Sequence, residues 1–223
     1  MDSANRFFTW AFDTRARTVR KIYEGEQMSM EKMFLSFCSH EPAFVSDGPA
    51  GLNASVKGVG FLPKREFLEE TLEAYLRHIR SYRPDDKDYS RRGLALLLEQ
   101  IYSPEARERI DFSCLGSLEL AKRQSWQNYQ VNRRAVLIFH QPPMISYKLK
   151  GYVEIFDEEA SGERELYQQF INAQHDVYHT PGGMELWKKQ PAYLFHIEEV
   201  YDNSATREGF GRRLAYPIPE SEQ

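Results

Sequence analysis

The chain has little of what marks secreted, membrane-spanning or zinc-binding proteins. Its two cysteines, Cys38 and Cys114, form neither a CxxC pair nor a zinc-type spacing, which fits a reducing compartment and a packing role for both thiols. The first residues lack the pattern of a signal peptide, and no apolar run approaches the ~20 residues that a membrane span requires. These absences predict a soluble, cytoplasmic protein with no membrane partner.

An excess of basic residues is also missing. The 29 Lys and Arg residues stand against 33 Asp and Glu residues, which gives a net charge of -4 and argues against general nucleic-acid binding. This balance still leaves room for a local basic pocket that holds a single phosphate.

Familiar catalytic signatures are absent too. The sequence has no GxSxG element of the kind that presents a nucleophilic serine. His175 and His179 lie four residues apart in HDVYH, but the Glu of an HExxH motif and a third ligand are missing. We therefore expect no metal site.

What the chain does contain is ample apolar material arranged in short, turn-bounded segments. Hydrophobic residues make up 41% of the sequence and aromatic residues 13%, enough for a core. Their alternation predicts an α+β fold with one antiparallel sheet, a split β-barrel in outline. The predicted strands are 33–40, 42–47, 52–62, 133–141, 145–157 and 191–202.

Helical periodicity separates the early strands from the late ones. The segment 63–82 opens with Pro63 and places its apolar residues on one side, which predicts an amphipathic helix. Segments 91–110 and 161–179 are also expected to be helical, and residues 2–33 helical or irregular. Because no repeat or linker is evident, we expect a single domain over 1–223 with a helical insertion at about 63–110.

The stretch from Asp47 to Pro63, DGPAGLNASVKGVGFLP, combines glycine-rich turns with a polar alternation. An extended strand there places Asn53, Ser55 and Lys57 on one face, and small apolar residues on the other. This pattern is typical either of a half-solvated strand or of a strand that faces a ligand.

A second candidate region begins at FSCLGS, residues 112–117. If this segment is a turn that opens a helix, its backbone N–H groups and the hydroxyls of Ser113 and Ser117 could hold a phosphate. Lys122 and Arg123 would complete the anion pocket, and Trp126 would either border the ligand or pack in the core. The competing interpretation is an ordinary serine cap followed by solvated basic residues.

The order of these motifs resembles the pyridoxamine-phosphate-oxidase-like family, whose fold is the FMN-binding split β-barrel. The resemblance covers roughly residues 34–62 and 111–202. It rests on NASVKG at 53–58, on FSCLGS followed by Lys122-Arg123, on the segment Asn132 to Phe139, on KGYVEI at 150–155 and on the last strand FHIEEVY. The chain departs from the family in its helical insertion and in having Val56 where the family motif has proline.

The resemblance implies an FMN-binding oxidoreductase that passes hydride or electrons between a reduced nucleotide and an unknown acceptor. It also implies a homodimer with the flavin at the subunit interface. The implied cofactor-binding residues are Asn53, Ser55, Lys57, Ser113, Ser117, Lys122, Arg123 and Trp126. Two alternatives remain open: a non-enzymatic split-barrel binding protein, and a haem-binding variant with His140 or His196 as axial ligand.

Overall fold

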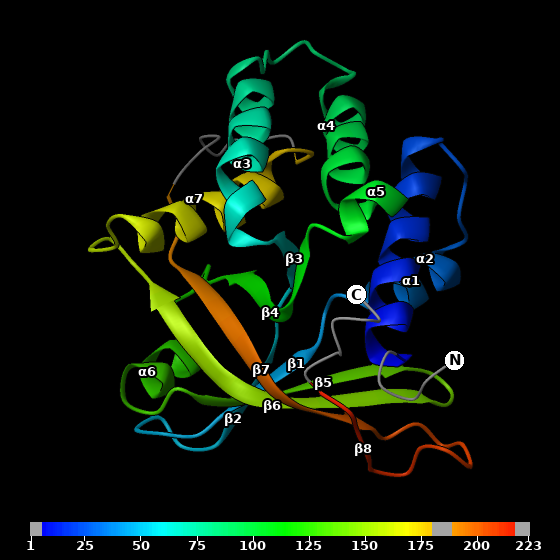
Figure 1. Cartoon of the computed structure of the whole chain (residues 1–223), viewed down its shortest axis with the longest axis vertical. Coiled ribbons are helices and arrows are strands. Elements are labelled where there is room, and N and C mark those ends of the chain that lie inside the picture. Colours follow the sequence, from blue (N-terminus) through cyan, green and yellow to red (C-terminus); the bar gives the residue numbers. More distant parts are fainter. Residues whose placement is uncertain (1–5, 180–188, 217–223) are drawn as a thin grey trace.

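The computed structural model describes residues 6–179 and 189–216. Most of its helices lie to one side of a long, curved sheet, as Figure 1 shows. The helices are α1 (Arg6–Tyr23), α2 (Met30–Phe37), α3 (Arg65–Arg80), α4 (Tyr89–Leu97), α5 (Pro104–Arg107), α6 (Gln124–Val131) and α7 (Glu163–Asp176), with a π-helical turn η2 (Leu98–Tyr102). The strands are β1 (Ala43–Ser46), β2 (Asn53–Val56), β3 (Gly60–Pro63), β4 (Ile110–Leu118), β5 (Arg134–Gln141), β6 (Ile145–Phe156), β7 (Ala192–Asp202) and β8 (Arg212–Leu214).

The strands form one antiparallel sheet. Its order is β2-β1-β5-β6-β7-β4-β3, and β8 pairs with β7. Antiparallel registers link every neighbouring pair, with the longest ladders between β5, β6 and β7. The predicted α+β class with an antiparallel sheet is therefore confirmed. The strand path is open rather than closed, in keeping with a split β-barrel.

The inner face of the sheet carries the core. One row across four strands joins Phe44, Leu137, Leu149 and Val200, and all of them are buried. The curvature also brings distant strands together, because the ring of Phe44 on β1 lies 6.3 Å from that of Phe195 on β7. Burial of this row supplies the hydrophobic driving force that the alternation predicted.

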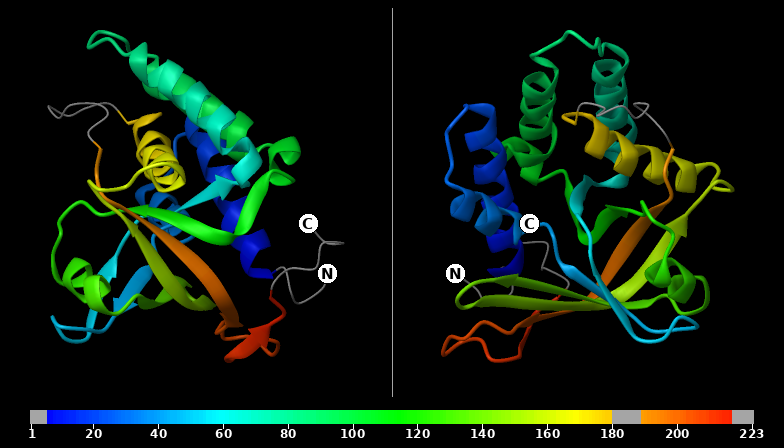
Figure 2. Two further views of the ribbon diagram at one scale, coloured as in Figure 1. Left: turned by 60° about the vertical axis from the view of Figure 1, so that its left-hand side comes forward. Right: turned by 180° about the vertical axis from the view of Figure 1, so that it is seen from behind.

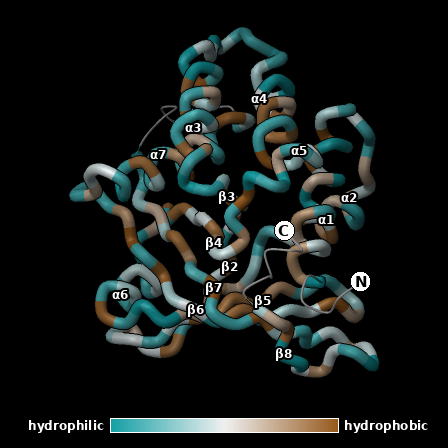
Figure 3. The backbone as a smooth tube through the Cα atoms, in the orientation of Figure 1, coloured by the Kyte–Doolittle hydropathy of each residue, from teal (hydrophilic) through white to brown (hydrophobic). Residues whose placement is uncertain are grey.

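The helices expected within 63–110 are present as α3, α4, η2 and α5. Leu68, Leu72 and Tyr75 of α3 are buried, and the Tyr75 ring stacks on Phe170 of α7 at 5.8 Å. The connection between α3 and α4 is hydrophilic and projects away from the sheet, as the teal segment in Figure 3 shows. No helix in the described part of the chain is both long and apolar enough to cross a membrane.

Two secondary-structure predictions are wrong. Most of the segment 33–40, expected as a strand, belongs to α2, because Ser29 caps a helix by accepting a hydrogen bond from the Lys32 N–H. FSCLGS, expected as a turn leading into a helix, lies inside β4. Its Gly116 serves close packing, since a Cβ there would lie 2.8 Å from Cγ1 of Ile171. The following helix, α6, begins only at Gln124.

Candidate functional site

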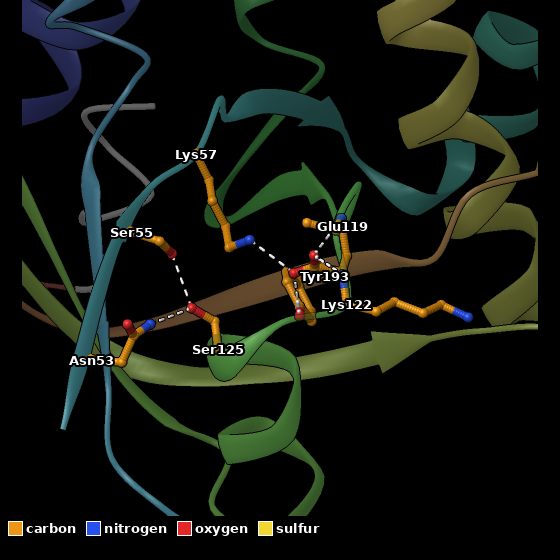
Figure 4. A network of polar contacts seen from close by, with 8 residues as sticks. Asn53, Ser55, Lys57, Glu119, Lys122, Ser125 and Tyr193 are labelled. Atoms are coloured by element: carbon orange, nitrogen blue, oxygen red, sulfur yellow. Dashed lines mark hydrogen bonds and ion pairs between the residues drawn. The ribbon is translucent and has the colours of Figure 1, made fainter. Parts of the chain in front are cut away.

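The polar alternation of β2 points into the protein. The Asn53 amide donates to Ser125 Oγ at 2.8 Å, and the Ser55 hydroxyl lies 2.9 Å from the same oxygen. Ser125 belongs to the first turn of α6, so this helix covers the polar side of the strand. Asn53 and Ser55 thus share one face, as predicted, and both contact the protein's own serine (Figure 4).

Lys57 forms a buried ion pair. Its Nζ lies 2.8 Å from Oε2 of Glu119, whose side chain is 2% exposed, while the Lys57 side chain is 13% exposed. The Tyr193 hydroxyl donates to the same carboxylate oxygen at 2.7 Å. The other oxygen accepts from the backbone N–H groups of Ala121 and Lys122 at 2.9 and 2.7 Å. Figure 4 shows these donors converging on Glu119.

This cluster joins the two ends of the strand path. Lys57 directly follows β2 at one edge of the sheet, whereas Glu119 directly follows β4 near the other end. Tyr193 comes from β7, beside β4. The ion pair therefore acts as a clasp across the open side of the barrel, and we call Lys57, Glu119 and Tyr193 the clasp.

Within the clasp, the Glu119 carboxylate is compensated by the Lys57 ammonium and by hydrogen-bond donors. Burial alone would raise the pKa of Glu119, but hydrogen bonds from Lys57, Tyr193 and the Ala121 N–H outweigh it and lower that pKa below its ordinary value. Burial and the adjacent Glu119 carboxylate raise the pKa of Tyr193, which keeps its hydroxyl protonated as a donor. The charge of Lys57 is therefore neutralised within the chain.

The hydrogen-bond donors around Glu119 are of the kind that bind phosphate oxygens in other proteins. A lysine, a phenol and two successive backbone N–H groups form an anion-binding arrangement. In this chain the anion is the Glu119 carboxylate. The face expected to line a cofactor cleft is thus occupied by the protein's own side chains.

Ser113 and Ser117 do not join a phosphate pocket at a helix start. The Ser113 hydroxyl and N–H both bond to the Asp111 carboxylate, two residues earlier on β4. Ser117 is 2% exposed within the same strand, and its hydroxyl has no hydrogen-bond partner among the described residues. The expected constellation fails because Ile110–Leu118 is extended, which separates these serines from the start of α6.

Lys122, Arg123 and Trp126 do gather at one place, the N-terminus of α6. Arg123 occupies the cap position without a capping side-chain hydrogen bond. The Lys122 ammonium lies 5.3 Å from the Trp126 ring centroid and 3.3 Å from the exposed Glu158 carboxylate. Lys122 also has a positive φ of 48°, an uncommon conformation for a residue other than glycine. This is the candidate region that remains open to solvent.

The outer face of the sheet was not predicted as a site. Register pairing aligns Val56, Ala43 and Ile138 in one outward row, and Ala54, Val45 and Val136 in the next. We call these residues the aliphatic face. Val56 is 67% exposed and Ile138 38% exposed, so aliphatic side chains point to solvent while the polar side of β2 points inward.

Charged and aromatic side chains continue both rows on the neighbouring strands. Lys148 and Lys150 of β6 lie 4.4 and 5.1 Å from the ring centroid of Tyr201 on β7. Lys150 also lies 3.5 Å from the Glu199 carboxylate. The outer surface therefore changes from aliphatic at β2, β1 and β5 to mixed charge at β6 and β7, the strands that Figure 2 shows from two further sides.

The histidines form no ligand cluster. The rings of His175 and His179 lie 4.5 Å apart, but no group of three metal-binding side chains occurs among the described residues. His140 is exposed on β5. His196 stacks on Tyr152 at 4.7 Å, and its Nε2 lies 3.4 Å from a Glu154 oxygen.

The residues missed by sequence reasoning are Glu119, Ser125 and Tyr193. Each is a polar residue whose importance comes from a contact with a distant segment. A signal for Glu119 was present in its position, because a lone carboxylate follows the apolar strand and precedes Lys122-Arg123. Nothing in the sequence indicated that its partner would be Lys57.

No protein-family model and no curated protein matches this chain. Among solved structures it is similar to HupZ from Group A Streptococcus, at 13% identity and a TM-score of 0.40, over 85% of this chain and 100% of that chain. A HupZ variant that carries one substituted residue gives 13% identity and a TM-score of 0.38, over 79% and 99%.

A protein from Lactobacillus delbrueckii, assigned as a pyridoxamine 5′-phosphate oxidase, matches at 13% identity and a TM-score of 0.39, over 78% of this chain and 93% of that chain. By its description this structure is of the type that the motif order resembles. At such low identity and TM-scores, these likenesses identify neither a cofactor nor a reaction for this chain.

Proposed function

We propose that this protein is a self-associating, non-enzymatic binding protein of split-barrel type, which pairs with a second copy of itself through the aliphatic face. The observation that carries the proposal is the inverted amphipathicity of β2. Its polar side chains are satisfied inside by Ser125 and Glu119, whereas Val56 and Ala54 point outward on an edge strand. Edge strands of monomeric proteins usually present charge or proline instead.

A second copy suits this surface better than an unrelated partner. The aliphatic face carries no charged residue, and its rim at Lys148, Lys150 and Glu199 carries both signs. A two-fold contact places the same patch on both subunits, so aliphatic rows meet aliphatic rows and opposite rim charges can pair. Burial of exposed valine and isoleucine side chains supplies the driving force.

Light scattering during size-exclusion chromatography tests this contact. We expect wild type to elute as a dimer and Val56→Glu to elute as a monomer, because the variant places a charge in the centre of the interface. Leu120→Glu is the matched control, since Leu120 is equally exposed at 67% but lies outside the aliphatic face. A monomeric wild type, or dissociation by Leu120→Glu alone, would reject the proposal.

FMN binding is the second candidate, and one observation favours it. The uncapped N-terminus of α6 carries Lys122, Arg123 and the ring of Trp126 together on the solvent side. A helix N-terminus with two adjacent cations attracts phosphate, and an aromatic ring can support a flavin. Bound FMN would supply the redox chemistry between a reduced nucleotide and an acceptor, while these residues would hold and orient it.

Fluorescence titration separates this candidate from the first. If the FMN phosphate lies at this helix start, Lys122→Ala weakens FMN binding roughly ten- to hundredfold and leaves riboflavin nearly unchanged. Lys21→Ala is the control, because Lys21 forms a comparable exposed ion pair with Glu26 at 3.0 Å. A wild type that binds neither flavin rejects FMN without affecting the dimer proposal.

A further inference from the structure

One side of β2 has no partner strand in the described part of the chain, because β2 is the first strand of the sheet. The Lys57 N–H donates to the Pro42 carbonyl at 3.2 Å, which fixes the ladder between β2 and β1. Bonded and non-bonded residue pairs alternate in an antiparallel ladder. Ser55 therefore bonds to β1, whereas Ala54 and Val56 direct their N–H and C=O groups away from it. We call this side of β2 the free edge.

The free edge lies at the margin of the molecule. Figure 1 shows β1 and β2 at the end of the molecule opposite α3 and α4. The residues at which the described ranges begin or end lie elsewhere: Arg6 beside Asp202, His179 beside His175, Lys189 beside Glu165 and Tyr216 beside Phe8. Ala54 and Val56 are both exposed, so the free edge is accessible to another chain.

The free edge lacks the features that protect the edge strands of monomeric proteins. Those features are charged side chains, proline and covering segments. Ala54 and Val56 are apolar, and Leu52, just before the strand, is 80% exposed. Lys57, the charged residue that follows them, turns inward to Glu119. The segment therefore presents a template for pairing with a further strand.

β2 is also held in the extended form that strand pairing requires. The side chains of Asn53 and Ser55 both contact Ser125 on α6. The Asn128 side chain of the same helix accepts from one backbone group and donates to another in the turn before β2, at 2.8 and 2.7 Å. Because the strand is already ordered, β2 loses little conformational entropy when another strand binds.

We propose that the free edge of β2 binds an extended segment of another polypeptide, which adds a strand to the sheet. The free N–H and C=O groups of Ala54 and Val56 are two residues apart, and an extended chain offers donors and acceptors at the same spacing. β1 shows which side chains suit such a neighbour, since it places Ala43 and Val45 beside the outward residues of β2. The partner segment therefore carries small or β-branched apolar residues at alternate positions.

The free edge differs from the aliphatic face, although Ala54 and Val56 contribute to both. A second copy on the aliphatic face uses their outward side chains, whereas an added strand uses their backbone groups. The binding of an extended segment therefore does not rest on self-association, and the two proposals fail separately.

Fluorescence anisotropy with a labelled peptide tests the free edge. The probe has the β1 sequence 41–47, because β1 is a strand that already pairs with β2. One isomer of the probe carries N-methyl groups on Ala43 and Val45, and the other carries them on Phe44 and Ser46. Alternate N–H groups of a strand point to opposite sides, so only one isomer keeps the donors that face β2. We expect saturable binding of the unmodified probe and of one isomer, and roughly ten- to hundredfold weaker binding of the other.

Equal binding of the two isomers overturns the proposal, because a contact through side chains alone would not distinguish them. The absence of a saturable rise with the unmodified probe overturns it as well. A monomeric wild type that binds the probe rejects self-association and leaves the free edge in place.

Two variants make the result specific to the backbone of β2. Val56→Pro removes a free N–H and should lose probe binding, whereas Val56→Thr keeps that N–H and should retain it. Equal binding by the two variants overturns the proposal. If Val56→Pro does not fold, Ala54→Pro replaces it, with Ala54→Ser as its control. Light scattering of the same variants tests the other occupant: if the proline variant alone dissociates a wild-type dimer, a second copy occupies the free edge and the proposal falls.

Discussion

Two cations in the described part of the chain, the largely buried Lys57 and the buried Arg15, are in opposite situations. Lys57 meets a buried carboxylate at 2.8 Å, and every acceptor of that carboxylate has a donor. Arg15 is equally enclosed, but it meets only neutral phenols among the described residues. A lysine can lose its proton on burial, whereas an arginine cannot. Arg15, whose charge burial cannot remove, therefore has neutral phenols as partners, while Lys57 has a carboxylate.

The two cations differ in whether a carboxylate of the described chain compensates their charge. The Lys57–Glu119 pair is complete within the chain, so it needs no ligand and holds β2 against the end of β4. Arg15 has no carboxylate partner among the described residues, and no sequence motif marked it. The conspicuous polar pattern of β2 thus led to a region that the chain's own side chains fill.

The largest expected effect comes from breaking the clasp. Lys57→Met leaves the Glu119 carboxylate buried without its cation, which should cost about 3–5 kcal/mol of unfolding free energy. Urea denaturation measures this loss. The double variant Lys57→Met/Glu119→Leu removes both charges and should recover most of the stability. If the double variant is as unstable as the single one, the lost packing rather than the unpaired charge explains the effect.

The second-largest effect should come from acid, which reduces the stability that the clasp contributes. Because the folded state lowers the pKa of Glu119 below its ordinary value of 4.5, its ionised form adds stability at pH values above that number. This contribution should decline as the pH falls below about 4.5 and should vanish once the folded-state carboxyl is protonated. Glu119→Gln should flatten this part of the pH–stability curve. Arg15→Met leaves Glu119 and its hydrogen-bond donors untouched, so it should leave the acid slope unchanged.

The sheet and most helices could be predicted because their signals are local. Alternation in Arg134–Gln141 and Ile145–Phe156, and the apolar side of Arg65–Arg80, follow directly from burial on one face. The strand predicted over 33–40 was wrong because a short apolar run is compatible with either a strand or a helix. Here the Ser29 cap stabilises the helix. The turn predicted at FSCLGS was wrong because Gly116 is needed for close packing against Ile171 within a strand. The sequence does not reveal this long-range contact.

The site could be predicted only in part, because its contacts are long-range. Alternation placed Asn53 and Ser55 on one face correctly, but it could not say that Ser125 and Glu119 would cover that face. The burial of Arg15 depends on helices and turns that are far apart in the sequence. Lys122, Arg123 and Trp126 stay together because they are adjacent along one short segment.

A smaller effect is expected where the polar face of β2 meets α6. Ser125→Ala removes the oxygen that both Asn53 and Ser55 contact, and leaves those groups partly unsatisfied. The expected cost is about 1–2 kcal/mol, well below that of Lys57→Met because no charge is left unpaired. Urea denaturation of Ser125→Ala beside Ser36→Ala, a partly exposed control on α2 whose hydroxyl bonds only within its own helix, measures the difference.

The smallest effect should come from Arg15→Met, although this residue is only 7% exposed. Removal of an uncompensated charge relieves a desolvation penalty, and the methionine chain refills most of the volume. The lost hydrogen bond to Tyr178 acts in the opposite direction. We expect the unfolding free energy to stay within about 1 kcal/mol of wild type in sodium HEPES. A loss as large as that of Lys57→Met would mean that the phenols alone compensate Arg15, and the contrast between the two buried cations would disappear.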